Sequence, residues 1–80
     1  MTPQELYSIV IEYIKKRAAE ERGGVFTVEP VRVVMSIYNR RIPQMQRLVR
    51  EILYRTGCVV AVKTGKRYKL LLSTACVRKL

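Results

Sequence analysis

The periodicity of the apolar residues changes near Gly57, and this change constrains the fold more than any other feature of the sequence. Before Gly57, apolar residues recur every three to four positions, as on one side of an α-helix. After it, the runs CVVAVKT (residues 58–64) and RYKLLLST (residues 67–74) are typical of β-strands and surround a Gly-Lys pair. Two such runs around a glycine-containing turn predict an antiparallel hairpin. We therefore expect an α+β fold in which helices precede a hairpin.

Residues that typically begin and end helices divide the first part of the chain into three helices. Thr2 is followed by a proline and, three residues later, by Glu5, as in a capping box. Thr27 is the expected cap of the second helix, and Asn39 tolerates the left-handed conformation that a tight turn needs. Residues 75–80 fit either a last helical turn or an extension. The expected elements of this single domain (residues 1–80) are a helix over 3–22, a strand over 25–28, helices over 29–38 and 43–56, and a hairpin over 58–74.

Each predicted helix has an apolar stripe that we expect to face the core. The stripes consist of Leu6, Ile9, Val10, Tyr13, Ile14 and Ala18 in the first helix, Val31, Val34, Met35 and Tyr38 in the second, and Met45, Leu48, Val49, Ile52 and Leu53 in the third.

This order of elements resembles a winged helix-turn-helix domain of a small, archaeal-like kind. The resemblance covers residues 26–72, with Thr27 before the second helix, Ile42 in the turn, and Gly57 just before the first hairpin strand. It implies three helices plus a C-terminal two-stranded β-hairpin, the wing. Pro43 departs from the family pattern, because many members place a small capping residue such as serine there.

The resemblance also implies a nucleic-acid-binding surface. In such domains the third helix enters the major groove, while the wing contacts the backbone or the minor groove. Amide side chains can bridge adenine, and arginine can pair with guanine. By position, the implied contacts are Gln44, Gln46, Arg47 and Arg50 on the third helix, Arg40 and Arg41 in the turn, and Lys63, Lys66, Arg67 and Lys69 in the wing.

The charge of the chain is strongly positive and uneven. Sixteen Lys and Arg residues against six Glu give a net charge of +10. Residues 1–29 have a net charge of −1, from four basic and five acidic groups, whereas residues 52–80 have seven basic groups and no acidic group. Such a gradient favours a polyanionic partner, since Lys and Arg near phosphates release condensed counterions.

The sequence argues against catalysis, cofactors and metals. It has no His and no Asp, its serines have no base to activate them, and it has no phosphate-binding loop. Cys58 and Cys76 are too few for a structural zinc site, and they fit either two buried thiols or a disulfide. The scarcity of Asn, Gln, Asp and His favours a thermophilic source.

Three functions fit these features. The first is DNA binding, as a cytoplasmic, nucleoid-associated transcription regulator or chromatin-like protein. The second is a ribosomal protein that binds rRNA, and the third is a protein-interaction module in a larger complex. A homodimer through the first helix, along Tyr7 and Ile11, accompanies the first function. We expect no membrane association, because no apolar run approaches about 18 residues, and no small-molecule ligand.

Overall fold

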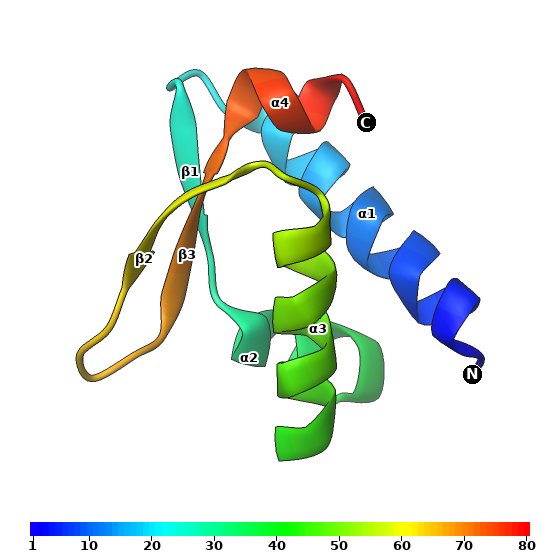
Figure 1. The fold of residues 1–80 in the computed structure, drawn as a ribbon. Helices are drawn as coiled ribbons and strands as arrows, with labels where there is room; N and C mark the ends of the chain where they lie inside the picture. Colours follow the sequence, from blue (N-terminus) through cyan, green and yellow to red (C-terminus); the bar gives the residue numbers. More distant parts are fainter.

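The computed structural model describes residues 1–80 as four α-helices and a three-stranded antiparallel sheet (Figure 1). In Figure 1, α3 lies between the hairpin and α1, and α4 lies against the C-terminal end of α1. In chain order, the elements are α1 (Pro3–Glu20), β1 (Val25–Val28), α2 (Pro30–Tyr38), α3 (Pro43–Arg55), β2 (Val59–Lys63), β3 (Lys69–Ser73) and α4 (Thr74–Arg78).

The predicted fold, a winged helix-turn-helix domain with three helices and a two-stranded hairpin, is wrong. The sheet has three strands in the order β1-β3-β2, because β1 also pairs with β3. Phe26 lies opposite Leu72, and Val28 lies opposite Leu70. All four side chains are buried, and such apolar cross-strand pairs stabilise a sheet. The hairpin is therefore part of a larger sheet in which β3 is the central strand.

The segment after β3 forms the fourth helix, α4, rather than an extension. Ser73 caps it, since its hydroxyl accepts a hydrogen bond from the backbone N–H of Cys76 at 3.2 Å. Arg78 donates to the carbonyl oxygens of Ala18 at 3.0 Å and of Glu21 at 2.8 Å. Ala18 also accepts the backbone N–H of Glu21 at 3.3 Å, so Arg78 adds donors to the carbonyls at the C-terminal end of α1 and joins α4 to it.

A single apolar core joins the helices to one face of the sheet. β3 contributes Leu70 and Leu72, which are fully buried, and α1 contributes every fourth residue from Leu6 to Ala18. The buried apolar residues are Leu6, Val10, Ile14, Ala18, Phe26, Val28, Val33, Val34, Val49, Ile52, Leu53, Cys58, Leu70, Leu72 and Val77.

The buried stripe of α2 is shifted by one residue from the predicted one. Pro30, Val33 and Val34 are buried, whereas Met35 is 43% exposed. The spacing 30, 33, 34 and 37 is as helical as the predicted 31, 34, 35 and 38, so periodicity alone does not distinguish them. The shift turns Val31 and Met35 toward a groove on the surface of the molecule.

A disulfide joins Cys58 to Cys76, whose Cα atoms are 5.5 Å apart. It links the residue before β2 to α4, two segments 18 positions apart in the sequence. Of the two alternatives that the sequence left open, the structure therefore has the disulfide, and no free cysteine is present.

Candidate nucleic-acid interface

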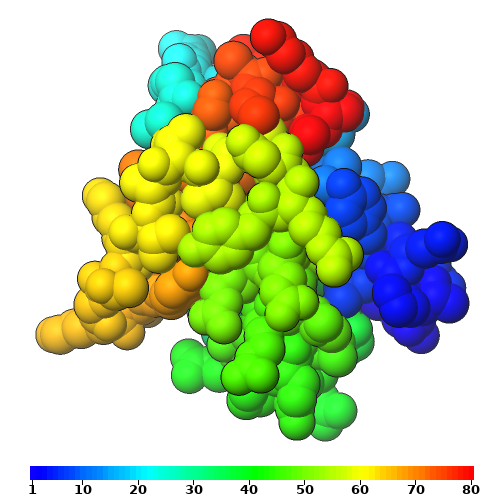
Figure 2. All heavy atoms as spheres, in the orientation of Figure 1, coloured from blue at the N-terminus to red at the C-terminus, as the bar shows by residue number.

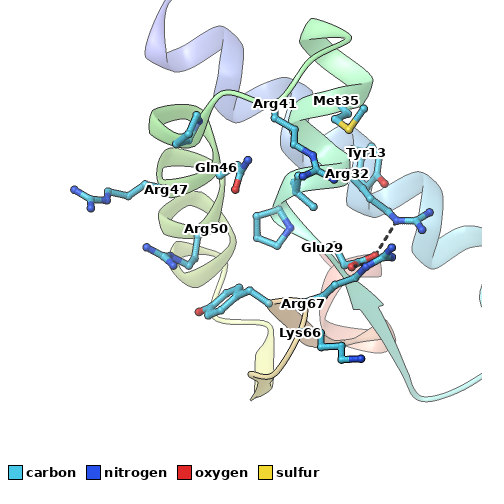
Figure 3. Close-up of a pocket in the computed structure, with 14 residues that line it drawn as sticks. Tyr13, Glu29, Arg32, Met35, Arg41, Gln46, Arg47, Arg50, Lys66 and Arg67 are labelled. Atoms are coloured by element: carbon cyan, nitrogen blue, oxygen red, sulfur yellow. Dashed lines mark ion pairs between the residues drawn. The ribbon is translucent and has the colours of Figure 1, made fainter.

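A groove of about 870 Å³ lies between α2, α3 and the loop that joins β2 to β3 (Figure 3). The space-filling view shows this loop projecting beside α3, with a hollow between them (Figure 2). One carboxylate, that of Glu29, lines the groove together with six cationic side chains. The cationic residues are Arg32, Arg41, Arg47, Arg50, Lys66 and Arg67.

The predicted contact residues divide into two sets. In Figure 3, Gln46 and Arg41 point toward the space between α2 and α3, while Arg47 extends outward from α3. The predicted residues that line the groove are Arg41, Gln46, Arg47, Arg50, Lys66 and Arg67, and those outside it are Arg40, Gln44, Lys63 and Lys69.

The residues outside the groove still lie on the elements that border it. Arg40 is exposed in the turn before α3, and Gln44 is exposed in the first turn of α3. Lys63 and Lys69 are direct cross-strand partners at the base of the β2–β3 loop. Like charges directly opposite each other destabilise a strand pair, so a bound anion would relieve this repulsion.

Two charged residues of the groove, Glu29 and Arg32, are absent from the predicted site. Glu29 and Arg32 lie beside the predicted inner face of the second helix rather than in the predicted turn, third helix or wing. Their spacing was nevertheless informative, because a Glu and an Arg three positions apart in a helical segment can form an ion pair.

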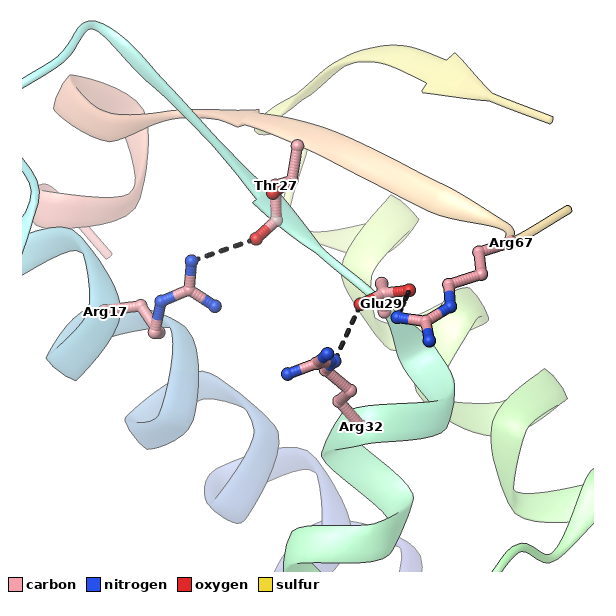
Figure 4. A network of polar contacts seen from close by, with 5 residues as sticks. All are labelled: Arg17, Thr27, Glu29, Arg32 and Arg67. Carbon is pink, nitrogen blue, oxygen red and sulfur yellow. Dashed lines mark hydrogen bonds and ion pairs between the residues drawn. The ribbon is translucent and has the colours of Figure 1, made fainter. Parts of the chain in front are cut away.

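Glu29 forms ion pairs with two arginines from different parts of the chain (Figure 4). Its Oε2 lies 2.8 Å from Nε of Arg32, and its Oε1 lies 3.7 Å from Nη1 of Arg67. The Glu29 side chain is only 11% exposed, whereas those of Arg32 and Arg67 are 66% and 62% exposed. Glu29 thus connects α2 to the β2–β3 loop at one end of the groove.

A second set of contacts connects α3 to the same loop. The guanidinium of Arg50 lies over the ring of Tyr68, 5.1 Å from its centroid, and the hydroxyls of Tyr54 and Tyr68 are 3.0 Å apart. The hydrogen bond with Tyr68 raises the pKa of the Tyr54 phenol above its ordinary value. Both walls of the groove are therefore joined to the loop by side-chain contacts.

A smaller, mostly apolar groove of about 270 Å³ lies between the first turn of α1, the end of α2 and α3. Tyr7, a residue of the predicted dimer face, is 40% exposed here. Ile11 is half-buried and packs against the core, so it offers less surface than predicted. The apolar lining consists of Met1, Leu6, Tyr7, Tyr38, Met45, Leu48 and Ile52.

The structure has no cluster of three or more His, Cys, Asp or Glu side chains that could hold a metal ion. None of its helices has the length and apolar composition needed to cross a bilayer.

Comparisons with models of protein families, with curated proteins and with solved structures find no match to this chain.

Proposed function

We propose that the protein binds duplex DNA through the groove between α2, α3 and the β2–β3 loop, which we call the basic groove. The observation that carries this proposal is the gathering of six cationic side chains from three separate segments around one surface. Solubility alone does not require cationic side chains to cluster on one surface. Lys and Arg that contact phosphates release condensed counterions, which supplies a large part of the affinity for nucleic acid.

The shape of this side of the molecule favours a duplex. The first half of α3 is solvent-exposed at Gln44 and Arg47. The major groove of B-DNA is about 12 Å wide and admits a helix, and Gln and Arg have the donors and acceptors that base edges require. With α3 in the major groove, Lys66 and Arg67 of the projecting loop would lie toward a phosphate ridge, where contacts fix the orientation of the protein. The proposed setting is the nucleoid of the cytoplasm, as a regulator or a chromatin-like protein.

Two other functions remain as outcomes of the test. Structured RNA, including rRNA, offers the same phosphates, but its deep and narrow major groove does not admit a helix. A protein-interaction module would have little affinity for either nucleic acid. Salt dependence and the choice between polymers therefore distinguish the three functions.

The experiment is a salt-titrated binding assay with duplex DNA and structured RNA of equal length. We expect the protein to prefer the duplex, with an affinity that falls steeply as salt rises. The double variant Lys66→Ala/Arg67→Ala should lower the slope of log K against log salt by about two. The matched control is Lys16→Ala/Arg22→Ala, which removes two exposed charges outside the basic groove. Its slope of log K against log salt should stay close to that of the wild type. Equal losses in both double variants would refute the proposed surface, and preference for RNA would favour the ribosomal function.

We propose separately a homodimer through α1, which the smaller groove supports. Glu51 and Arg55 also line this apolar groove. In a two-fold interface, Glu51 of one copy can face Arg55 of the second copy, and the reverse. Sedimentation equilibrium should then detect a dimer that Tyr7→Glu converts to a monomer. A wild-type protein that is monomeric at all concentrations would refute the dimer without affecting the DNA-binding proposal.

A further inference from the structure

Glu29 is the one carboxylate that lines the basic groove, and its position is unfavourable for a surface that binds only phosphates. A negative charge there repels the DNA backbone and partly cancels the nearby arginines. Glu29 is also largely buried, with 11% of its side chain exposed, so it is a fixed part of the groove floor rather than a solvated surface residue.

The two oxygens of this carboxylate have different hydrogen-bonding environments. Oε2 is paired with Arg32 at 2.8 Å. Oε1 is buried and has no hydrogen-bond partner. Nη1 of Arg67 lies 3.7 Å from Oε1, beyond the roughly 3.2 Å limit of an N–H···O hydrogen bond. A buried acceptor without a donor is uncommon in folded proteins, and its position in the basic groove calls for a functional explanation.

The backbone around Glu29 is held by hydrogen bonds, whereas Arg67, the cation beside Oε1, is mostly exposed. The end of β1 is held by Arg17, whose Nη2 donates to the carbonyl oxygen of Thr27 at 3.1 Å (Figure 4). Pro30 follows Glu29, and the carbonyl oxygen of Glu29 accepts the N–H of Arg32 at 3.0 Å. Arg67, by contrast, lies on the projecting loop with 62% of its side chain exposed.

We propose that Oε1 of Glu29 accepts a hydrogen bond from the exocyclic amino group of a base, and so determines sequence preference. This inference rests on the proposed DNA binding. When Arg67 turns from Glu29 to a backbone phosphate, Oε1 becomes accessible within the basic groove. Phosphates have no donor to offer a carboxylate. In the major groove of DNA the donors are the amino groups of cytosine (N4) and adenine (N6), and carboxylates are typical acceptors for cytosine.

Two simpler roles for Glu29 predict different results. If Glu29 acted only as a counter-charge, removing it would raise the affinity for every duplex by a common factor. If it acted only by orienting Arg32 and Arg67, removing it would lower the affinity for every duplex by a common factor. An acceptor for a base changes the ratio of affinities between sequences, which neither alternative does.

The experiment measures dissociation constants, at one salt concentration, for a panel of duplexes in which each base pair of a selected site is changed in turn. We expect the wild-type protein to prefer a cytosine or an adenine at one position by about tenfold. Glu29→Ala should abolish that preference and preserve those at the other positions. Glu29→Gln should move the preference toward adenine, because an amide can bond to both N6 and N7 of that base. The base that the wild type selects identifies which amino group Glu29 contacts.

The control variant is Glu12→Gln, which makes the same charge change on the exposed side of α1, outside the basic groove. It should leave all preferences unchanged. If Glu29→Ala does not fold, as judged by circular dichroism, the nearly isosteric Glu29→Gln carries the test. If the Glu29 variants change the dissociation constants of all duplexes by one common factor, up or down, the inference is overturned while DNA binding stands. A wild type that binds no duplex would overturn DNA binding and this inference together.

Discussion

Reduction of the Cys58–Cys76 disulfide should lower the free energy of unfolding by about 3 kcal/mol. The two residues are 18 positions apart in the sequence. In the chain-entropy model, a cross-link that closes a loop of about this length restricts the unfolded chain by roughly 3 kcal/mol at 25 °C. A domain as small as this buries a limited fraction of its surface, so the loss is a large part of its stability.

The assay is guanidinium unfolding followed by circular dichroism, with and without a reductant. We expect the midpoint to fall on reduction, and the thermal midpoint to fall by about 12 °C or more. The variant Cys58→Ala/Cys76→Ala is the control, because the reductant has no disulfide to act on there and should not shift its midpoint. Two reactive thiols in the native unreduced protein, or a loss well below about 1 kcal/mol on reduction, would refute the reasoning.

Three further predictions concern stability and the tyrosine pair. Leu70→Ala should cost about 2–5 kcal/mol in urea unfolding, because Leu70 is fully buried on the central strand, whereas Val60→Ala, at a residue 56% exposed, should cost little. Arg78→Ala should cost about 1 kcal/mol in the same assay, since it removes the donors to the carbonyls that end α1, and an unchanged midpoint would contradict that role. Ultraviolet titration should find Tyr54 ionising above 10.0, and Tyr68→Phe should lower its pKa. Because that pKa is raised in the folded state, the stabilisation by the pair is complete below the unfolded pKa and is lost as pH rises through the folded one.

Features fixed by near neighbours in the sequence could be predicted from it. Thr2 accepts the N–H of Glu5 at 3.1 Å, and Asn39 has a φ of 58°, so the expected cap and the expected left-handed turn are both confirmed. Each depends on residues within a few positions of one another. The predicted cap of the second helix is wrong, because Thr27 pairs with Leu71 in the sheet and Glu29 takes the cap position.

Features that depend on distant segments could not be predicted in the same way. β1 and β3 are more than 40 residues apart, and a four-residue β-rich segment does not indicate its partner. The pairing follows from the burial of Phe26 and Val28 against Leu70 and Leu72, which appears only once the helices are packed. The strand over residues 25–28 was predicted, but its pairing with β3 was not, and this pairing is what makes the fold prediction wrong.

The candidate site depends on a one-residue ambiguity in α2. Because Val33 and Val34 face the core, Arg32 lies on the opposite side from the buried stripe, next to Glu29 and across from Arg67. With the predicted stripe, Val31 and Met35 would have been core residues and could not have lined the basic groove. The cations of the hairpin were visible in the sequence as a charged loop, but a lone charged loop has no acceptor and no opposing wall. The packing of α2 supplies both, so the proposed readout of bases depends on which residues of α2 face the core.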